Sequence, residues 1–184
     1  MTSTRRPLVV LAFVLAAGAV VWARGDIRIT PVPSDGRVLV SFTARDSWTL
    51  GVRELLQGAQ QVTFAYEIEL RRPAPFWFFD TALARARVNT VAKFDTLSAK
   101  YKVTRFRDGR TEQSDRLDQE TNVRDWLTAV DHVELDPVAP LEPNVEYYVH
   151  VDLTISPRRS VSVWSLLPFS RGENAGRQPF TFIK

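Results

Sequence analysis

Residues 61–70 alternate strictly between large apolar side chains and polar or small ones. The apolar positions are Val62, Phe64, Tyr66, Ile68 and Leu70. Successive side chains of a strand point to opposite faces, so this period of two predicts a strand with one apolar face and one polar face. Five large apolar side chains on one face need a second layer of structure to cover them. We expect the rest of the chain to supply that layer.

Other alternating segments predict that the chain is mainly β. The further expected strands cover residues 27–32, 37–44, 82–94, 100–106, 111–117, 145–155 and 179–183. Turn signals separate them, including Pro33–Gly36, Asp108-Gly109 and Asn174–Gly176, and the polar strand 111–117 is expected at a sheet edge. A doubly covered parallel sheet would show continuous apolar runs instead. We therefore expect an antiparallel β-sandwich, or a flattened barrel, of about seven strands with two short helices.

The first expected helix covers residues 48–56. Its apolar side chains recur at helical spacing and are Trp48, Val52, Leu55 and Leu56. Asp46 or Ser47 is expected to cap its start, and Gly58 to end it. We expect this helix to close one end of the β-layer, and a helix that binds a partner is the alternative.

The second expected helix covers residues 122–130, with Asn122 as its N-cap. Its apolar positions are Val123, Trp126, Leu127 and Val130. Asp131, His132 and Glu134 follow and carry atoms that can bind a metal, but no second histidine stands at ligand spacing. We interpret them as a solvated helix end, where a protonated histidine favours the helix dipole.

The N-terminal residues 1–23 resemble a targeting segment. Arg5 and Arg6 precede an apolar run over residues 8–22, and Val21-Trp22-Ala23 places small residues where a signal peptidase cuts. The run is shorter than the roughly twenty residues that span a bilayer. We expect a cleaved signal peptide or, alternatively, an N-terminal anchor over residues 8–23 in the inner membrane. Either one predicts export to the periplasm or cell envelope.

Length and composition exclude several classes of partner and of reactive site. Residues 26–184 are enough for one domain with a full core. The chain has no cysteine, which excludes disulfides, thiolate metal sites and a cysteine nucleophile. Its formal net charge is only +3, so a nucleic-acid partner is not expected. Its oligomeric state is not predicted.

Four consecutive aromatic residues, Phe76, Trp77, Phe78 and Phe79, stand in an expected loop behind Arg71 and Arg72. Exposed aromatic side chains in a loop mark a protein partner site or a membrane contact, and the arginines would suit anionic head groups. A second apolar loop adds Trp164, Leu166 and Phe169 as candidate contacts. The alternative is that these rings fold back over an open end of the core.

Candidate catalytic groups are few. His150 and Asp152 share a strand face next to Tyr148, and they would need a nucleophile opposite them to act together. Glu67 and Glu69 are also same-face neighbours, and paired carboxylates can hydrolyse glycosidic bonds. We interpret both sets as the polar faces of strands. Arg85 and Arg87 are the expected cross-strand partners of the glutamates. No catalytic residue, cofactor or metal is predicted.

A series of short motifs recurs in one known family. In chain order they are Ser41–Asp46, Gly58 with Val62–Leu70, Phe76-Trp77 with Asp80, Phe94–Tyr101 and Leu166–Phe169. In this order and spacing they resemble an uncharacterised bacterial family, domain of unknown function 4390. The resemblance implies an exported, envelope-associated protein and brings no known activity. The chain departs from the family pattern at its end, where a tryptophan is expected and Phe180–Lys184 stands.

These observations lead to three hypotheses. The first is a non-enzymatic interaction module of the bacterial envelope that binds a protein partner or the membrane surface through its aromatic loops. The second is a carrier of a small apolar ligand or lipid between the sheets, with room left by Ala84, Ala86 and Ala92. The third is an unrecognised hydrolase.

Overall fold

The computed structural model describes residues 27–34, 36–74, 80–158 and 174–183. Its strands are β1 (Arg28–Ser34), β2 (Arg37–Thr43), β3 (Gln61–Arg72), β4 (Thr81–Asp95), β5 (Lys100–Arg107), β6 (Arg110–Leu117), β7 (Ala129–Leu135), β8 (Glu146–Arg158) and β9 (Asn174–Thr181). Its helices are the 3-10 turn η1 (Arg45–Ser47), α1 (Leu50–Gln57) and α2 (Glu120–Thr128).

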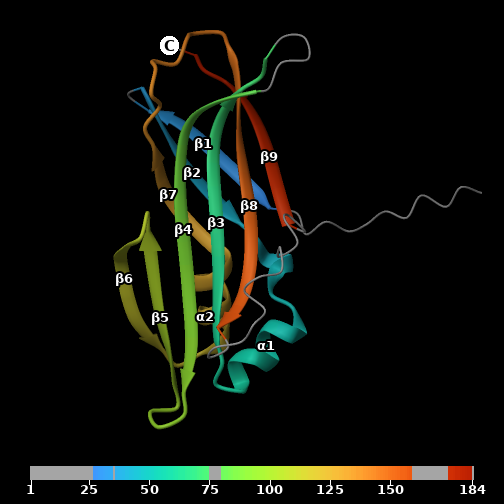
Figure 1. Cartoon of the computed structure of the whole chain (residues 1–184), viewed down its shortest axis with the longest axis vertical. Helices are drawn as coiled ribbons and strands as arrows, with labels where there is room; N and C mark the ends of the chain where they lie inside the picture. Colours follow the sequence, from blue (N-terminus) through green and yellow to red (C-terminus); the bar gives the residue numbers. More distant parts are fainter. Residues whose placement is uncertain (1–26, 35, 75–79, 159–173, 184) are drawn as a thin grey trace, which may run out of the picture.

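The strands form two antiparallel sheets (Figure 1). The larger sheet has the order β6-β5-β4-β3-β8-β9, and the smaller has the order β1-β2-β7. β3 lies inside the larger sheet, between β4 and β8. The two sheets stay separate and do not close into a barrel, so the predicted β-sandwich is confirmed and its alternative, a flattened barrel, is not formed.

Two kinds of structure cover the inner face of the larger sheet. The smaller sheet lies over one half of it, and α1 and α2 lie over the other half (Figure 1). The two sheets meet at one side, where β1 contacts β9. At that point a Cβ atom on Gly176 would lie 2.7 Å from the carbonyl oxygen of Ile27. The absence of a side chain at Gly176 therefore lets the two layers approach closely.

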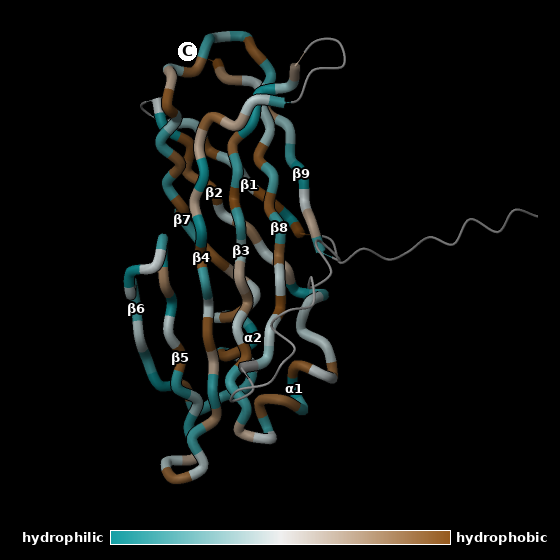
Figure 2. Tube along the Cα trace, in the orientation of Figure 1, coloured by the Kyte–Doolittle hydropathy of each residue, from teal (hydrophilic) through white to brown (hydrophobic). Residues whose placement is uncertain are grey.

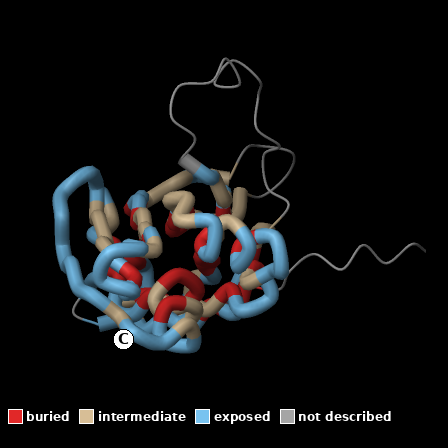
Figure 3. Tube along the Cα trace, turned by 90° about the horizontal axis from the view of Figure 1, so that it is seen from below, coloured by how far each residue is buried: buried red, intermediate tan, exposed pale blue. Residues whose placement is uncertain are grey.

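The apolar face of β3 forms the centre of the core, as its alternation predicts. All five apolar side chains, Val62, Phe64, Tyr66, Ile68 and Leu70, are fully buried. Figure 2 shows the alternation of hydropathy along the strands, and Figure 3 shows the buried positions in the interior. Burying each such side chain contributes about 1.5–3 kcal/mol. Ala84, Ala86 and Ala92 of β4 are buried on the same face.

Two hydroxyl groups of the larger sheet hold the C-terminal end of α2. The carbonyl oxygen of Leu127 accepts hydrogen bonds from Tyr66 in β3 at 2.7 Å and from Thr90 in β4 at 3.1 Å. Carbonyls in the last turn of a helix have no partner within the helix, and this one is buried. Burial also raises the pKa of Tyr66 well above its usual range, so its hydroxyl stays a donor.

Arg105 of β5 reinforces the same helix end. Its guanidinium donates to the carbonyl oxygens of Trp126 at 3.3 Å and Ala129 at 3.1 Å, and it lies 4.7 Å from the centre of the Trp126 ring. A cation at a helix C-terminus complements the helix dipole. Burial lowers the pKa of Arg105, but an arginine stays charged at neutral pH.

The structure corrects the region after α2. The helix ends at Thr128 and runs directly into β7, so the interpretation of residues 131–134 as a solvated helix end is wrong. β7 pairs with β2, and a bulge interrupts their register between Val40 and Phe42. The extra residue lies in β7, where Asp131 and His132 together face Ser41. His132 has a positive φ of 55°, and its N–H donates to the Ser41 hydroxyl at 3.2 Å. With β7, the described strands number nine instead of about seven.

Three predicted boundaries also differ. Asp46 and Ser47 form η1, and the N-cap of α1 is Thr49, whose Oγ1 accepts from the Val52 N–H at 3.4 Å. Gln119, in place of Asn122, precedes α2. The predicted turn Asn174–Gly176 belongs to β9, which starts at Asn174. The predicted end of α1 at Gly58 is confirmed.

Candidate functional site

Only two of the predicted contact residues lie within the described part of the chain. Phe76, Trp77, Phe78, Phe79, Trp164, Leu166 and Phe169 lie outside the described residues. Arg71 and Arg72 end β3, and each is held by a carboxylate. Arg71 Nε donates to Glu69 at 2.6 Å, and Arg72 forms two hydrogen bonds with Glu142, at 2.6 and 3.1 Å.

The residues on either side of the aromatic segment are joined by Asp80. Its carboxylate accepts the Ala74 N–H at 3.0 Å and the Tyr148 hydroxyl at 2.5 Å. We call Ala74, Asp80 and Tyr148 the loop base. Tyr148 belongs to β8 and is almost fully buried, so the loop base is attached to the rigid sheet. Asp80 belongs to one of the family motifs in the sequence, but nothing in the sequence pairs it with Tyr148.

Tyr148 is fixed from two sides. The guanidinium of Arg177 in β9 stacks on its ring, 3.7 Å from the ring centre, and its hydroxyl donates to Asp80. A cation over an aromatic face is a favourable contact. Burial, and then the hydrogen bond to the Asp80 carboxylate, raise the pKa of Tyr148. The tyrosine hydroxyl therefore stays protonated at neutral pH and can donate this hydrogen bond.

The loop base is expected to weaken in acid. The hydrogen bond from Tyr148, followed by that from Ala74, holds the pKa of Asp80 below its ordinary value. A lowered folded-state pKa stabilises the folded form above the ordinary value of about 4, and this stabilisation is lost as the pH falls through the folded value. Hydrogen exchange at the Ala74 amide should therefore speed up below about pH 4, beyond its intrinsic pH dependence.

Asp80→Asn tests this prediction, because an amide does not titrate in this range. In that variant, protection of the Ala74 amide should be low and independent of pH. The exposed Asp136→Asn is the matched control and should retain the wild-type profile. A wild-type amide that stays equally protected at pH 3 would contradict the role of the ionised carboxylate.

Exposed apolar side chains lie close to the loop base. Val138, 86% exposed, follows β7, and its N–H donates to the carbonyl oxygen of Leu83, three residues after Asp80. Ile183, 77% exposed, follows Phe182, whose carbonyl oxygen accepts the N–H of Asn144. The connection between β7 and β8 and the C-terminal segment therefore meet at this end of the sandwich (Figure 1).

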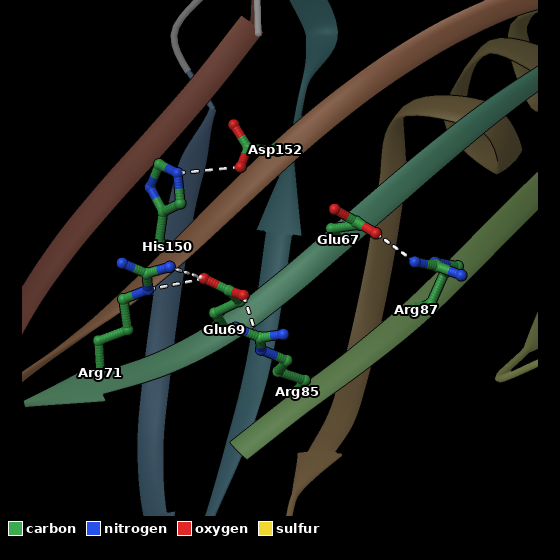
Figure 4. Close-up of polar contacts among 7 residues, drawn as sticks. All are labelled: Glu67, Glu69, Arg71, Arg85, Arg87, His150 and Asp152. Carbon is green, nitrogen blue, oxygen red and sulfur yellow. Dashed lines mark hydrogen bonds and ion pairs between the residues drawn. The ribbon is translucent and has the colours of Figure 1, made fainter. Parts of the chain in front are cut away.

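The outer face of the larger sheet carries a cluster of paired charges (Figure 4). Glu67 and Glu69 of β3 stand directly opposite Arg87 and Arg85 of β4, and each forms an ion pair with its partner. Glu69 also holds Arg71. The predicted cross-strand pairs are confirmed. Each glutamate faces a guanidinium, which is the arrangement of a structural ion pair across a sheet.

His150 and Asp152 complete this cluster from β8. Their side chains lie on the shared strand face that the sequence predicts and form a pair, with 3.0 Å between Nε2 and the carboxylate. An open depression of about 520 Å³ lies beside the cluster, reaching from Glu67 to the turn at Gly109. Within it the side-chain oxygen of Asn89 is buried and has no partner among the described residues. Among the same residues, no three acidic or histidine side chains converge as metal ligands would.

Comparison with known proteins gives one match. The model of a family described as Domain of unknown function (DUF4390) matches residues 26–160. The chain belongs to this family. The resemblance inferred from the motifs is thereby confirmed, and Leu166–Phe169 lies beyond the matched DUF4390 region. No curated protein and no solved structure matches this DUF4390 chain.

The DUF4390 region includes the loop base and the charged cluster of the outer face. In the described part of the chain, no helix is long and apolar enough to cross a membrane. Residues 1–23, the predicted signal peptide or membrane anchor, lie outside that part.

Proposed function

We propose that this DUF4390 protein is an exported, non-enzymatic interaction module of the cell envelope, and that it binds a protein partner at the end of the sandwich that carries the loop base. The apolar N-terminal run supports export. The observation that carries the proposed site is the loop base itself. Asp80 ties the two flanks of a strongly aromatic segment to a buried tyrosine of the sheet.

The ion pairs at this end favour a protein over anionic head groups. Arg71 and Arg72 are the cations nearest the aromatic segment in sequence, and both are already bound by carboxylates. A lipid phosphate would have to displace Glu69 or Glu142 before it could pair with them. Interfaces between proteins are instead enriched in aromatic side chains and arginine.

The exposed side chains of Val138 and Ile183 supply apolar surface at this end of the sandwich. Apolar patches rimmed by polar residues mark protein interaction sites more often than isolated apolar residues do. We therefore place the interface on the aromatic segment, with Val138 and Ile183 at its margin.

Site-specific photo-cross-linking in cells tests this proposal. A photoreactive amino acid in place of Trp77 in the full-length chain should give one discrete protein adduct. The same group in place of Leu50, 67% exposed in α1, is the control and should not give that adduct. The double variant Trp77→Ser and Phe78→Ser should abolish the association that the adduct reports, with an unchanged melting temperature.

Two outcomes would contradict the proposal. If the double variant melts well below the wild type, the aromatic side chains cover the core instead of a partner. If position 77 yields no adduct beyond that of Leu50, this end of the molecule is not the interface.

A further inference from the structure

Three positive side chains stand in a row on the outer face of the larger sheet, away from the charged cluster. Lys93 of β4 pairs in register with Lys102 of β5, which pairs in register with Arg116 of β6. All three are exposed, and we call them the cation row. Among the described residues, none of them forms an ion pair. Like charges directly opposite each other destabilise a sheet, so this row has a cost that no direct ion pair offsets among the described residues.

The same sheet face shows how such charges are compensated elsewhere. Arg85 and Arg87 each stand opposite a glutamate of β3 and pair with it. Next to the cation row, Val62 of β3 pairs in register with Ala92, the residue before Lys93. The β3 residue beside Lys93 is therefore Gln61, which carries no charge. At the cation row, β3 therefore supplies no acidic partner of the kind that Arg85 and Arg87 have.

The two acidic residues beside the cation row are engaged by other groups. Asp118 pairs with Lys100 at 3.0 Å. Asp95 accepts the Ser98 hydroxyl at 2.9 Å and the Leu97 N–H at 3.1 Å, which fixes the turn between β4 and β5. Asp95 interacts with Arg116 of the row through its charge but forms no ion pair with it, so the two acidic residues reduce the local positive charge only in part.

This turn places an apolar side chain at the very end of the sandwich. Leu97 is 97% exposed and lies in the turn that joins the strands carrying Lys93 and Lys102. Ala99 completes the turn with a positive φ of 52°. A single exposed leucine is ordinary, but here it stands next to uncompensated cations.

We propose that this end of the protein binds a membrane surface that contains anionic lipids, with Leu97 inserted among the lipids and the cation row against their phosphates. Peripheral proteins combine these two elements, an apolar side chain below the head groups and basic residues at their level. The choice of a membrane, in preference to a soluble polyanion, rests on the proposed location in the envelope and on Leu97.

The chain has no cysteine, so a single introduced cysteine can carry a label. The full-length Leu97→Cys variant, labelled with a fluorophore sensitive to polarity, is added to vesicles of phosphatidylcholine alone or with 30% phosphatidylglycerol. The label should report an apolar environment only with the anionic vesicles, and high salt should reduce the response. The Val138→Cys variant, labelled in the same way, controls for vesicle binding by residues 8–23 and should not respond.

A charge variant supplies the decisive comparison. Lys93→Gln, Lys102→Gln and Arg116→Gln together should raise the lipid concentration needed for half the response about a hundredfold, since each basic residue near such a surface contributes about fivefold. The matched control Arg28→Gln, Arg45→Gln and Arg110→Gln removes the same net charge and should respond like the parent. Removing the repulsion should also leave the row variant with an equal or slightly higher melting temperature.

Three results would overturn the inference: a response equal for both vesicle types, a response that survives in the row variant, or a soluble polyanion that binds the row as tightly as the vesicles do. Each is distinct from a failure of the proposed interface, because cross-linking at position 77 reports on the other end of β4.

Discussion

Replacing Tyr66 with alanine is expected to lower the free energy of unfolding by about 3–5 kcal/mol. Tyr66 is fully buried at the centre of the core, with the Phe42 ring 4.8 Å from its own. The substitution leaves a large cavity and removes one of the two hydroxyls that bind Leu127. For a domain of ordinary stability, 5–15 kcal/mol, this is a large fraction of the total.

Urea denaturation followed by tryptophan fluorescence measures this effect. The midpoint should fall strongly while the slope with denaturant stays constant, because the native and unfolded states keep their exposed areas. A loss below about 1 kcal/mol would mean that the core closes around the gap, or that Tyr66 is not central to it.

A double-mutant cycle separates the hydrogen bond from the packing. Tyr66→Phe and Thr90→Val each remove one donor from the Leu127 carbonyl and should each cost about 1 kcal/mol. Together they should cost more than the sum, since the carbonyl then stays buried without a partner. Strict additivity would show that the carbonyl is not shared between the two hydroxyls.

The second large effect is expected at Gly176. A Cβ atom there would lie 2.7 Å from the Ile27 carbonyl oxygen and 2.9 Å from the Ile27 Cβ. Backbone atoms cannot rotate away, so Gly176→Ala should force β1 and β9 apart and cost about 1–3 kcal/mol. Faster hydrogen exchange in β1 should accompany the lower melting temperature.

Gly51→Ala is a control that should change the stability in the opposite direction. Gly51 lies within α1, and the nearest atom to an added Cβ would be the Thr49 Oγ1 at 3.8 Å. Because glycine disfavours a helix, Gly51→Ala should stabilise the protein by about 0.5–1 kcal/mol. If both substitutions moved the stability in the same direction, close approach at Gly176 would not be the cause.

The alternation of side chains was sufficient to predict most of the larger sheet. In β3, β4 and β8 one face is buried and the other solvated, so period two is visible directly in the sequence. β7 is not predicted from the sequence, because the bulge at His132 interrupts the alternation of buried and exposed side chains along it. Its buried residues, Val130, Val133 and Leu135, are spaced three and then two apart, and Val130 also continues the helical pattern of α2.

The role of Gly176 could not be predicted from the sequence either. Gly176 follows Asn174 and Ala175, a sequence that favours a turn, yet it serves the contact between two layers. That requirement arises from β1, which is almost 150 residues earlier in the chain. Local sequence does not contain this information.

The contacts at the candidate sites also divide into those that the sequence predicts and those that it does not. The pairs of Glu67 with Arg87 and of Glu69 with Arg85 follow from two neighbouring strands of clear register, and they were predicted. The bond between Asp80 and Tyr148 and the cation row depend on the register of strands that polar patterns alone do not align. Only the tertiary arrangement reveals that some charges on this face are compensated and others are not.

The length of β4 has a mechanical consequence. It is a single strand from Thr81, beside the loop base, to Asp95, at the turn that carries Leu97, with one register shift in its pairing with β3. At about 3.3 Å per residue, this strand is about 45 Å long. β3 pairs with it from Thr81 to Ala92 and β5 from Val88 to Asp95, so every part of it is held by at least one neighbouring strand. A protein partner bound at the loop base would therefore be held at a fixed distance from a membrane bound at the Leu97 turn. In this respect the sandwich would act as a rigid spacer.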